Sequence, residues 1–348
     1  MRDRLLAVRR DRSYSHDLLA VGDGSVELAR SRAAERPGTY GLAWEGGHAV
    51  VGEVVELREK SVVRELVRVD HGVLARGKVA VDHVDVGDPM TAFGLEFEEV
   101  ELDSDVGPLP AWSIPAGSSR WAILAHGYGG RRASGLSFVP MLHRLGLSVL
   151  VPAYRNDPDA PESPDHRYHL GASEWRDLEA AIGQVARAGA SGIALYGWSM
   201  GAQVALRAWS RSARRDLVTG LVLDSPVLDW RAVMLHLGRE RRVPDVLSRL
   251  TMRLVERSIG VGLDELDWLR RAGELDVPVL VVHGDEDETV PCETSVTLAA
   301  LRPDVVTLRL VRGAGHVGSW NLDRAGYERA VGEFLRSVGA CPEAASRP

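Results

Sequence analysis

The chain has little of several features that would assign a protein to a class at once. Only two of its 348 residues are cysteines, Cys292 and Cys341, which is too few for a disulfide framework or a four-cysteine zinc site. It has no run of about 18 apolar residues, the length that a membrane-spanning helix needs, and its first residues lack the apolar core of a secretory signal. We therefore expect a reducing, cytoplasmic location and no membrane span.

An excess of basic residues is also missing. The chain has 42 lysines and arginines against 49 aspartates and glutamates, so its net charge is −7 and its pI is near 5.9. A basic face for nucleic acid is not indicated, and no nucleic-acid partner is expected. A composition of 45% hydrophobic and 26% charged residues is typical of a packed globular protein. The length favours one large α/β domain with a smaller appendage.

Residues 1–90 are predicted to form a small β-rich extension. Alternating apolar residues and glycine turns predict strands over residues 39–44, 49–57 and 61–69. A helix is expected over residues 25–35. No motif in this region suggests chemistry, so we expect it to pack on the main domain or on a second subunit, which would make a homo-oligomer.

Residues 91–340 alternate strand and helix patterns, which predicts an α/β domain. Short apolar runs such as Trp121–Ala125 and Gly192–Tyr196 are typical of buried parallel strands, whereas Glu174–Ala188 has apolar residues at helical spacing. This alternation predicts a mostly parallel, doubly wound sheet with helices on both faces. A helical stretch at residues 226–273 interrupts it, and an insertion at the ligand-facing edge of such a sheet is where a lid would lie.

The strongest chemical signal is the pentapeptide Gly197-Trp198-Ser199-Met200-Gly201. It follows a buried strand directly and opens the predicted helix Met200–Ser210. Such a sharp turn holds the serine in a strained backbone conformation, and the flanking glycines let neighbouring backbone pass close by. The hydroxyl would project above the sheet at a helix N-terminus, where developing negative charge is favoured. Ser199 is therefore the predicted nucleophile.

A serine hydroxyl needs a base to take its proton and a carboxylate to orient that base. His316 is the predicted base, because it lies in a glycine-rich loop between the last predicted strand and the last helix. Asp287 is the predicted acid, three residues before Val290-Pro291 opens the next helix. Asp285, which is nearer the end of the strand, and Asp224, which follows another strand, remain alternatives.

Two backbone N–H groups would complete the site as an oxyanion hole, where a carbonyl oxygen becomes negative. One is expected from Met200, the residue after the nucleophile. The other is expected from Tyr128, in the glycine-rich loop His126-Gly127-Tyr128-Gly129-Gly130 that follows the strand Trp121–Ala125. His126 itself is interpreted as a structural hydrogen-bonding residue.

Other polar residues carry weaker signals. Glu286 and Glu288, beside the predicted acid, are expected to be solvated or to cap the following helix. His166 and His169 form an H-x-x-H pair, but without placed carboxylates such a pair is weak evidence for a metal site. Neither a metal nor an organic cofactor is expected.

Four motifs follow one another along the chain: His-Gly-x-Gly-Gly, Gly-x-Ser-x-Gly, His-Gly-x-x-Asp-x-x-Val-Pro and Gly-x-Gly-His. Together they resemble the α/β-hydrolase superfamily over roughly residues 95–338. The segment Tyr168–Ile182 resembles the esterase and serine-peptidase-like branches, and the first ninety residues resemble the leader of some bacterial members. The resemblance implies the α/β-hydrolase fold, with Ser199, Asp287 and His316 as a triad in the family order.

These observations favour a serine hydrolase that acts on a small-molecule acyl substrate through an acyl-enzyme. A carboxylic ester is the first choice for the bond that is cleaved. A peptidase or amidase, or an acyltransferase that passes the acyl group to a bound alcohol or thiol, would use the same triad. A non-catalytic binding protein of the same fold is the alternative from a different class, although such proteins usually lack a triad residue and here all three are present.

Overall fold

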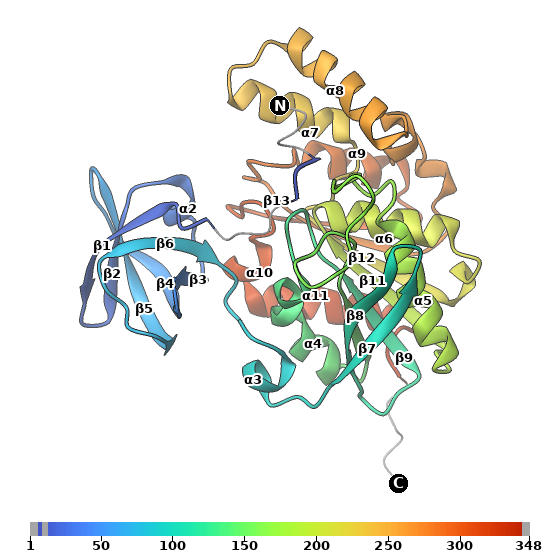
Figure 1. The fold of residues 1–348 in the computed structure, drawn as a ribbon, viewed down its shortest axis with the longest axis horizontal. Helices are drawn as coiled ribbons and strands as arrows, with labels where there is room; N and C mark the ends of the chain where they lie inside the picture. Colours follow the sequence, from blue (N-terminus) through green and yellow to red (C-terminus); the bar gives the residue numbers. More distant parts are fainter. Residues whose placement is uncertain (1–5, 9–12, 343–348) are drawn as a thin grey trace.

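A small barrel and a larger α/β domain lie side by side in the computed structural model (Figure 1), which describes residues 6–8 and 13–342. The predicted extension over residues 1–90 begins with residues 1–5 and 9–12, which lie outside the described residues, as do residues 343–348. The barrel and the larger domain are joined through a connection that contains the short helix α3 (Pro89–Phe93).

The barrel is closed by six strands in the order β1-β2-β5-β4-β3-β6. Their bounds are β1 His16–Gly22, β2 Ser25–Ala29, β3 Tyr40–Trp44, β4 Gly47–Leu57, β5 Ser61–His71 and β6 Gly77–Asp82. The three strands predicted here are confirmed, but the predicted helix over residues 25–35 is wrong. Val26 and Leu28 alternate into the barrel core as strand residues, and only α2 (Arg32–Glu35) is helical.

Arg64 organises the interior of the barrel. Its side chain is 1% exposed, and its guanidinium donates hydrogen bonds of 2.5–3.0 Å to the backbone carbonyls of Ala34, Arg36, Gly38 and Gly52. Burial lowers the pKa of Arg64. Because one of these carbonyls lies in α2 and two lie between α2 and β3, the buried arginine shapes the loop that faces the larger domain.

The larger domain is built on an eight-stranded sheet in the order β14-β13-β12-β11-β9-β10-β8-β7. The bounds are β7 Glu98–Ser104, β8 Gly107–Ile114, β9 Arg120–Ala125, β10 Ser148–Pro152, β11 Gly192–Trp198, β12 Val218–Asp224, β13 Val279–Gly284 and β14 Val306–Val311. Strands β14 to β10 are parallel in this order, and β8 and β7 add an antiparallel edge. The predicted mostly parallel sheet is confirmed.

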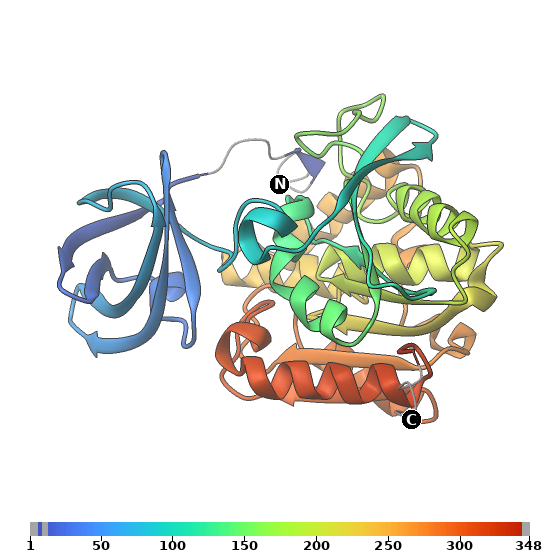
Figure 2. The same cartoon turned by 90° about the horizontal axis from the view of Figure 1, so that it is seen from below.

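Helices cover both faces of this sheet (Figure 2). In β9, Ile123 and Ala125 pack with residues of α5 and α6, whereas Ala122 and Leu124 pack with residues of α4 and α11. This alternation is what a strand buried on both sides requires. The helices are α4 Val139–Arg144, α5 Trp175–Arg187, α6 Met200–Arg211, α9 Glu293–Leu301, α10 Ser319–Leu322 and α11 Arg324–Ser337.

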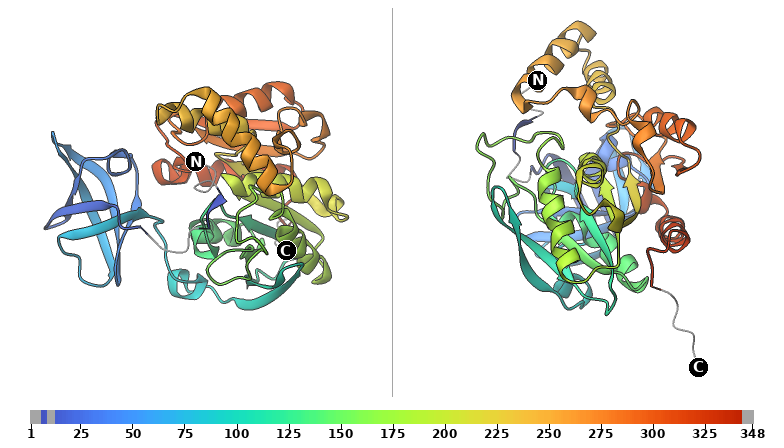
Figure 3. Two further views of the ribbon diagram at one scale, coloured as in Figure 1. Left: turned by 45° about the horizontal axis from the view of Figure 1, so that its top comes forward. Right: turned by 90° about the vertical axis from the view of Figure 1, so that its right-hand side faces the viewer.

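Between β12 and β13 the chain leaves the sheet and forms α7 (Trp230–Glu240) and α8 (Asp245–Ile259), which project at one end of the domain (Figure 3). The side of this pair that faces the domain is apolar and buried, and it includes Met234 and Met252. Leu247 is 52% exposed on the outer side of α8.

Within residues 6–8 and 13–342, no helix has both the length and the apolar character needed to cross a membrane.

We expect Arg64→Met to unfold the barrel at markedly lower denaturant concentration. Four buried carbonyls would lose their donor, and each unsatisfied group costs about 1–3 kcal/mol, so the free energy of unfolding should fall by at least about 3 kcal/mol. Arg68 is the matched control, because its side chain is 48% exposed and its pair with Asp70 lies at the surface. Arg68→Met should change stability by less than about 1 kcal/mol. Equal losses in urea unfolding of the two variants would contradict this role for Arg64.

Candidate active site

Ser199 lies at the turn between β11 and α6 in a backbone conformation that few residues adopt. Its φ is 55° and its ψ is −122°. Its backbone N–H donates to the carbonyl of Asp224 at 2.9 Å, and its own carbonyl accepts from the N–H of Val227 at 3.2 Å. Strain of this kind persists only where surrounding structure holds it, and here the last residue of β12 and the segment after it do so.

Close packing explains the two glycines of the pentapeptide. A Cβ on Gly201 would overlap the backbone carbonyl of Ala125 at the end of β9, and a Cβ on Gly197 would lie 2.5 Å from the carbonyl oxygen of Gly201. Any side chain at either position would therefore push α6 away from the sheet. The sequence motif thus reflects a real steric limit at this turn.

Ser199, His316 and Asp287 come from three separate loops and form one hydrogen-bonded row. The Oγ of Ser199 lies 2.9 Å from Nε2 of His316, and Nδ1 of His316 lies 2.7 Å from Oδ2 of Asp287. If Nδ1 carries the proton that faces the carboxylate, Nε2 is free to accept the hydroxyl proton. Ser199 and His316 are half-buried, whereas Asp287 is buried.

Four donors surround the carboxylate of Asp287. Its Oδ1 accepts from the N–H groups of Thr289 and Val290, both at 2.8 Å, and its Oδ2 faces both His316 and Nε2 of His283, the latter at 3.1 Å. Burial by itself would raise the pKa of Asp287, but the hydrogen bonds from His283 and His316 outweigh it and hold the pKa well below its usual range. The carboxylate is therefore charged at neutral pH.

His283 is a residue of the site that the sequence analysis did not identify. It is fully buried at the end of β13, and its Nδ1 lies 2.7 Å from the hydroxyl of Ser295, which can donate to it. Its Nε2–H is then directed at Asp287 and at the carbonyl of Val290. The only signal in the sequence is its position four residues before Asp287, which does not by itself predict a contact.

The loop that carries His316 is held on both sides. The N–H of Gly313 donates to Oδ1 of Asp285 at 2.6 Å, and the N–H of Val317 donates to Oγ of Ser225 at 3.0 Å. Val317 has a φ of 51°, which is rare for a β-branched residue. Asp285, the first alternative acid, thus binds the backbone of this loop and makes no contact with the imidazole that the structure records.

Asp224, the second alternative acid, binds two hydroxyl groups and makes no hydrogen bond with the imidazole that the structure records. Its Oδ2 accepts from the hydroxyl of Tyr327 at 2.8 Å, and its Oδ1 accepts from the hydroxyl of Ser225 at 3.1 Å. It is completely buried, and burial raises the pKa of Asp224 to about 6 although both hydroxyls lower it.

Glu288 does not behave as the sequence analysis expected. Instead of being solvated or capping a helix, its carboxylate forms an ion pair with Arg36, which lies in the barrel loop shaped by Arg64. The other oxygen of Glu288 accepts from the backbone N–H of His316 at 3.3 Å. The barrel is therefore connected to the histidine loop through one carboxylate.

The glycine-rich loop after β9 passes directly beside the serine. A Cβ on Gly127 would lie 3.1 Å from the Cβ of Ser199. Met200 is the first residue of α6, and the N–H groups of a first helical turn have no acceptor within the helix. The roles of the Met200 and Tyr128 amides stay predictions. His126 is buried and binds Asp157 at 2.8 Å and the Gly127 carbonyl at 3.0 Å, the contacts expected of a structural residue.

The two sides of Ser199 differ in character. Trp198 and His316 line a cavity of about 230 Å³ that reaches Arg36 and Tyr40 of the barrel. Met200 instead belongs to a buried apolar cluster with residues of α7 and α8. The residue before the serine therefore borders an open cavity, and the residue after it belongs to a packed apolar cluster.

The weak metal signal finds little support among the described residues. His169 binds Asp165 at 2.9 Å, and His166 forms an ion pair with Glu162. Within residues 6–8 and 13–342 no three histidine, cysteine, aspartate or glutamate side chains gather as ligands of a metal ion.

Comparison with known families matches the two parts of the chain separately. A model described as an alpha/beta hydrolase family matches residues 122–330. A model described as a domain of unknown function (DUF8805) matches residues 17–82, which is the barrel. The first match includes the serine, the aspartate and the histidine of the row.

Individual proteins are similar to the larger domain. The chain is 29% identical over 234 residues to the uncharacterized protein Rv2307c of Mycobacterium tuberculosis, covering 65% of this chain and 74% of that protein. The esterase Pf2001 of Pyrococcus furiosus has a TM-score of 0.60 at 22% identity, covering 74% of this chain and 95% of that one. A 2-hydroxy-6-oxo-6-phenylhexa-2,4-dienoate hydrolase of Rhodococcus sp. has a TM-score of 0.54 at 18% identity, covering 70% and 99%. These two structures show the fold.

We expect Asp224→Asn to change how stability depends on pH. An unfolded aspartate has a pKa of about 4, whereas folded Asp224 has a pKa of about 6. Between these values the folded chain keeps a proton that the unfolded chain loses, so this group lowers the free energy of unfolding of the wild type as pH rises from about 4 to 6. The variant lacks this loss. Its stability relative to the wild type should therefore rise by up to about 3 kcal/mol across that window in urea unfolding. A difference that stays constant with pH would contradict the assignment.

Proposed function

The chain belongs to the alpha/beta hydrolase family, and from this premise we propose that it is a serine hydrolase that cleaves a carboxylic ester of a small acyl substrate. The observation that carries the proposal is the continuous hydrogen-bonded row from Asp287 through His316 to Ser199. We divide the chain into an extension over residues 1–90 and a hydrolase domain over residues 91–340, and we propose that residues 226–273 form a lid.

In the first half of the reaction Oγ of Ser199 attacks the ester carbonyl carbon while Nε2 of His316 takes the hydroxyl proton. The carboxylate of Asp287 stabilises the imidazolium that forms. The N–H groups of Met200 and Tyr128 bind the carbonyl oxygen as it becomes negative. The imidazolium then gives its proton to the alcohol oxygen, the C–O bond breaks, and an acyl-enzyme remains.

In the second half a water molecule replaces the alcohol. His316 takes a proton from the water, the hydroxide attacks the acyl carbon, and the tetrahedral intermediate collapses to the carboxylic acid. The proton on His316 returns to Oγ of Ser199, so the enzyme is restored. A bound alcohol or thiol in the position of the water would give acyl transfer instead.

The surroundings of the row suggest where each part of the ester lies. The leaving alcohol must receive its proton from His316, so it lies on the side of the 230 Å³ cavity that includes Arg36 and Tyr40. The acyl chain then extends to the other side, toward the apolar cluster that contains Met200 and Met234. In this arrangement α7 and α8 act as a lid over the acyl chain.

The nucleophile is tested first. Ser199→Ala should lose at least about 10³-fold in kcat on short p-nitrophenyl esters, because the row acts as a unit. A fluorophosphonate probe should label the wild type and leave the variant unlabelled, while circular dichroism of the two stays the same. A wild type that neither reacts with the probe nor turns over any ester, thioester or aminoacyl amide would favour the non-catalytic alternative. Turnover of amides alone would favour a peptidase or amidase.

The acid is tested with three matched substitutions. Asp287→Asn should lower kcat by several orders of magnitude, on the order of 10⁴, because an amide favours the wrong tautomer of His316. Asp285→Asn and Asp224→Asn change residues that bind other partners than His316. Each should therefore lower kcat by less than about tenfold, which is a change of less than about 1.4 kcal/mol in the activation free energy. If Asp224→Asn proved the most damaging of the three, the assignment of the acid would be wrong.

A further inference from the structure

The first described residues lie against the larger domain, not in the barrel. In Figures 1 and 3 the dark blue segment Leu6–Val8 lies between α7 and the body of the α/β domain. The carbonyl of Leu6 accepts from the N–H of Tyr168 at 3.0 Å. The carbonyl of Ala7 accepts from the hydroxyl of Tyr128 at 2.6 Å. The segment is therefore attached through its backbone to two loops, the one between β10 and α5 that contains Tyr168 and the glycine-rich one that carries the predicted oxyanion donor.

The side chain of Leu6 is buried in the apolar cluster that contains Met200. It is 1% exposed, and it belongs to the cluster that contains Met200, Val227, Val290 and Met234. Met200 follows the serine directly, and the N–H of Val227 donates to the carbonyl of Ser199. Leu6 therefore belongs to the packed apolar cluster that also contains the residue after the nucleophile, on the side toward which the acyl chain is proposed to extend.

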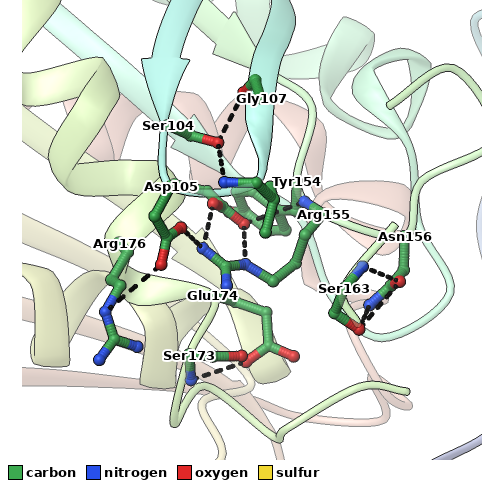
Figure 4. A network of polar contacts seen from close by, with 12 residues as sticks. Ser104, Asp105, Gly107, Tyr154, Arg155, Asn156, Ser163, Ser173, Glu174 and Arg176 are labelled. Carbon is green, nitrogen blue, oxygen red and sulfur yellow. Dashed lines mark hydrogen bonds and ion pairs between the residues drawn. The ribbon is translucent and has the colours of Figure 1, made fainter. Parts of the chain in front are cut away.

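The loop between β10 and α5, which contains Tyr168, is firmly anchored. Arg155 is buried and binds Asp177 at 2.7 and 2.9 Å and Asp105 at 2.5 Å (Figure 4). The carboxylate of Glu174 accepts from two N–H groups of the loop, at 2.6 and 2.9 Å. The ring of Tyr168 packs against that of Tyr128 at a centroid distance of 4.7 Å. The segment Leu6–Val8 is therefore bound to a loop that has little freedom to move.

We propose that Leu6 is a specificity-determining residue whose side chain closes the acyl subsite and restricts the enzyme to short acyl groups. The inference rests on the proposed esterase function and adds a substrate class, esters of short-chain acids. In this proposal Leu6 is a fixed part of the subsite and is not displaced by substrate, because two residues of the larger domain bind the backbone of its segment. Shortening its side chain to alanine removes three carbon atoms and opens room for an acyl chain longer by a similar amount.

The test is a chain-length profile. We would measure kcat/KM on p-nitrophenyl esters from acetate to decanoate for the wild type and Leu6→Ala. The preferred acyl chain should become longer in the variant, and the ratio of kcat/KM for a medium-chain ester to that for acetate should rise roughly 10–200-fold. Met234→Ala, which shortens another side chain of the cluster, should change the profile in the same direction.

Two control variants carry the same truncation elsewhere. Leu28→Ala lies in the barrel core, where Leu28 is as fully buried as Leu6, and Leu247→Ala lies on the exposed side of α8. Both should keep the wild-type profile, whatever their stability. If Leu6→Ala does not fold, Leu6→Val should give a smaller change in the same direction, because it removes one carbon atom.

The outcomes separate this inference from the proposed function. An active wild type whose profile is unchanged by Leu6→Ala or Leu6→Val would overturn the role of Leu6 and leave the esterase proposal standing. An equal increase in kcat/KM on all esters would also overturn it, because that result would mean that Leu6 restricts the access of every ester and does not select by acyl-chain length. A wild type that turns over no ester and resists the fluorophosphonate would remove the proposed function, and this inference with it.

Discussion

The close approach of α6 to the end of β9 is the constraint on which the site depends. Gly201 lies against the carbonyl of Ala125 at a distance that no Cβ would allow. Because the helix begins so near the sheet, the residue before it must turn sharply, and Ser199 takes a positive φ that a relaxed turn would avoid. In our proposal the same turn brings the N–H of Met200 and the hydroxyl of Ser199 to the substrate. Strain at one residue is thus what makes a nucleophile available there in our proposal.

Two buried carboxylates in this domain show how hydrogen-bond donors set the pKa of an acid against the effect of burial. Asp287 and Asp224 are both buried at the ends of neighbouring parallel strands. Asp287 faces two backbone N–H groups and two imidazoles, and its pKa falls. Burial raises the pKa of Asp224 to about 6, because the two hydroxyls that bind it lower the pKa by less. A pKa of about 6 still leaves Asp224 largely charged at neutral pH, so the two differ in contact: in the contacts that the structure records, it is Asp287 that binds the imidazole of His316.

The sequence predicted elements that depend on neighbouring residues, and it missed contacts between segments that are far apart in the chain. The strand, sharp turn and helix around Ser199 lie within a few residues of each other, so the local sequence pattern alone predicted them. Asp287 and His316 follow parallel strands, and the carboxyl ends of parallel strands meet at one edge of a sheet. Residues 25–29 were misassigned because pairing within a closed barrel overrode their local pattern. The contacts of Arg36 and Leu6 depend on segments hundreds of residues away, and no spacing rule predicts such contacts.

The part of the chain that precedes the hydrolase match therefore contributes to the site from two directions. Arg36 pairs with Glu288 beside the cavity proposed for the leaving alcohol, and Leu6 fills the cluster proposed for the acyl chain. Neither residue belongs to the matched residues 122–330, which contain the whole hydrogen-bonded row. In our proposal the chemistry thus belongs to the family fold, whereas Arg36 and Leu6, both among the first ninety residues, help to shape the spaces for the two substrate parts. Relatives that share the row but lack these two contacts should cleave the same bond in substrates of different shape.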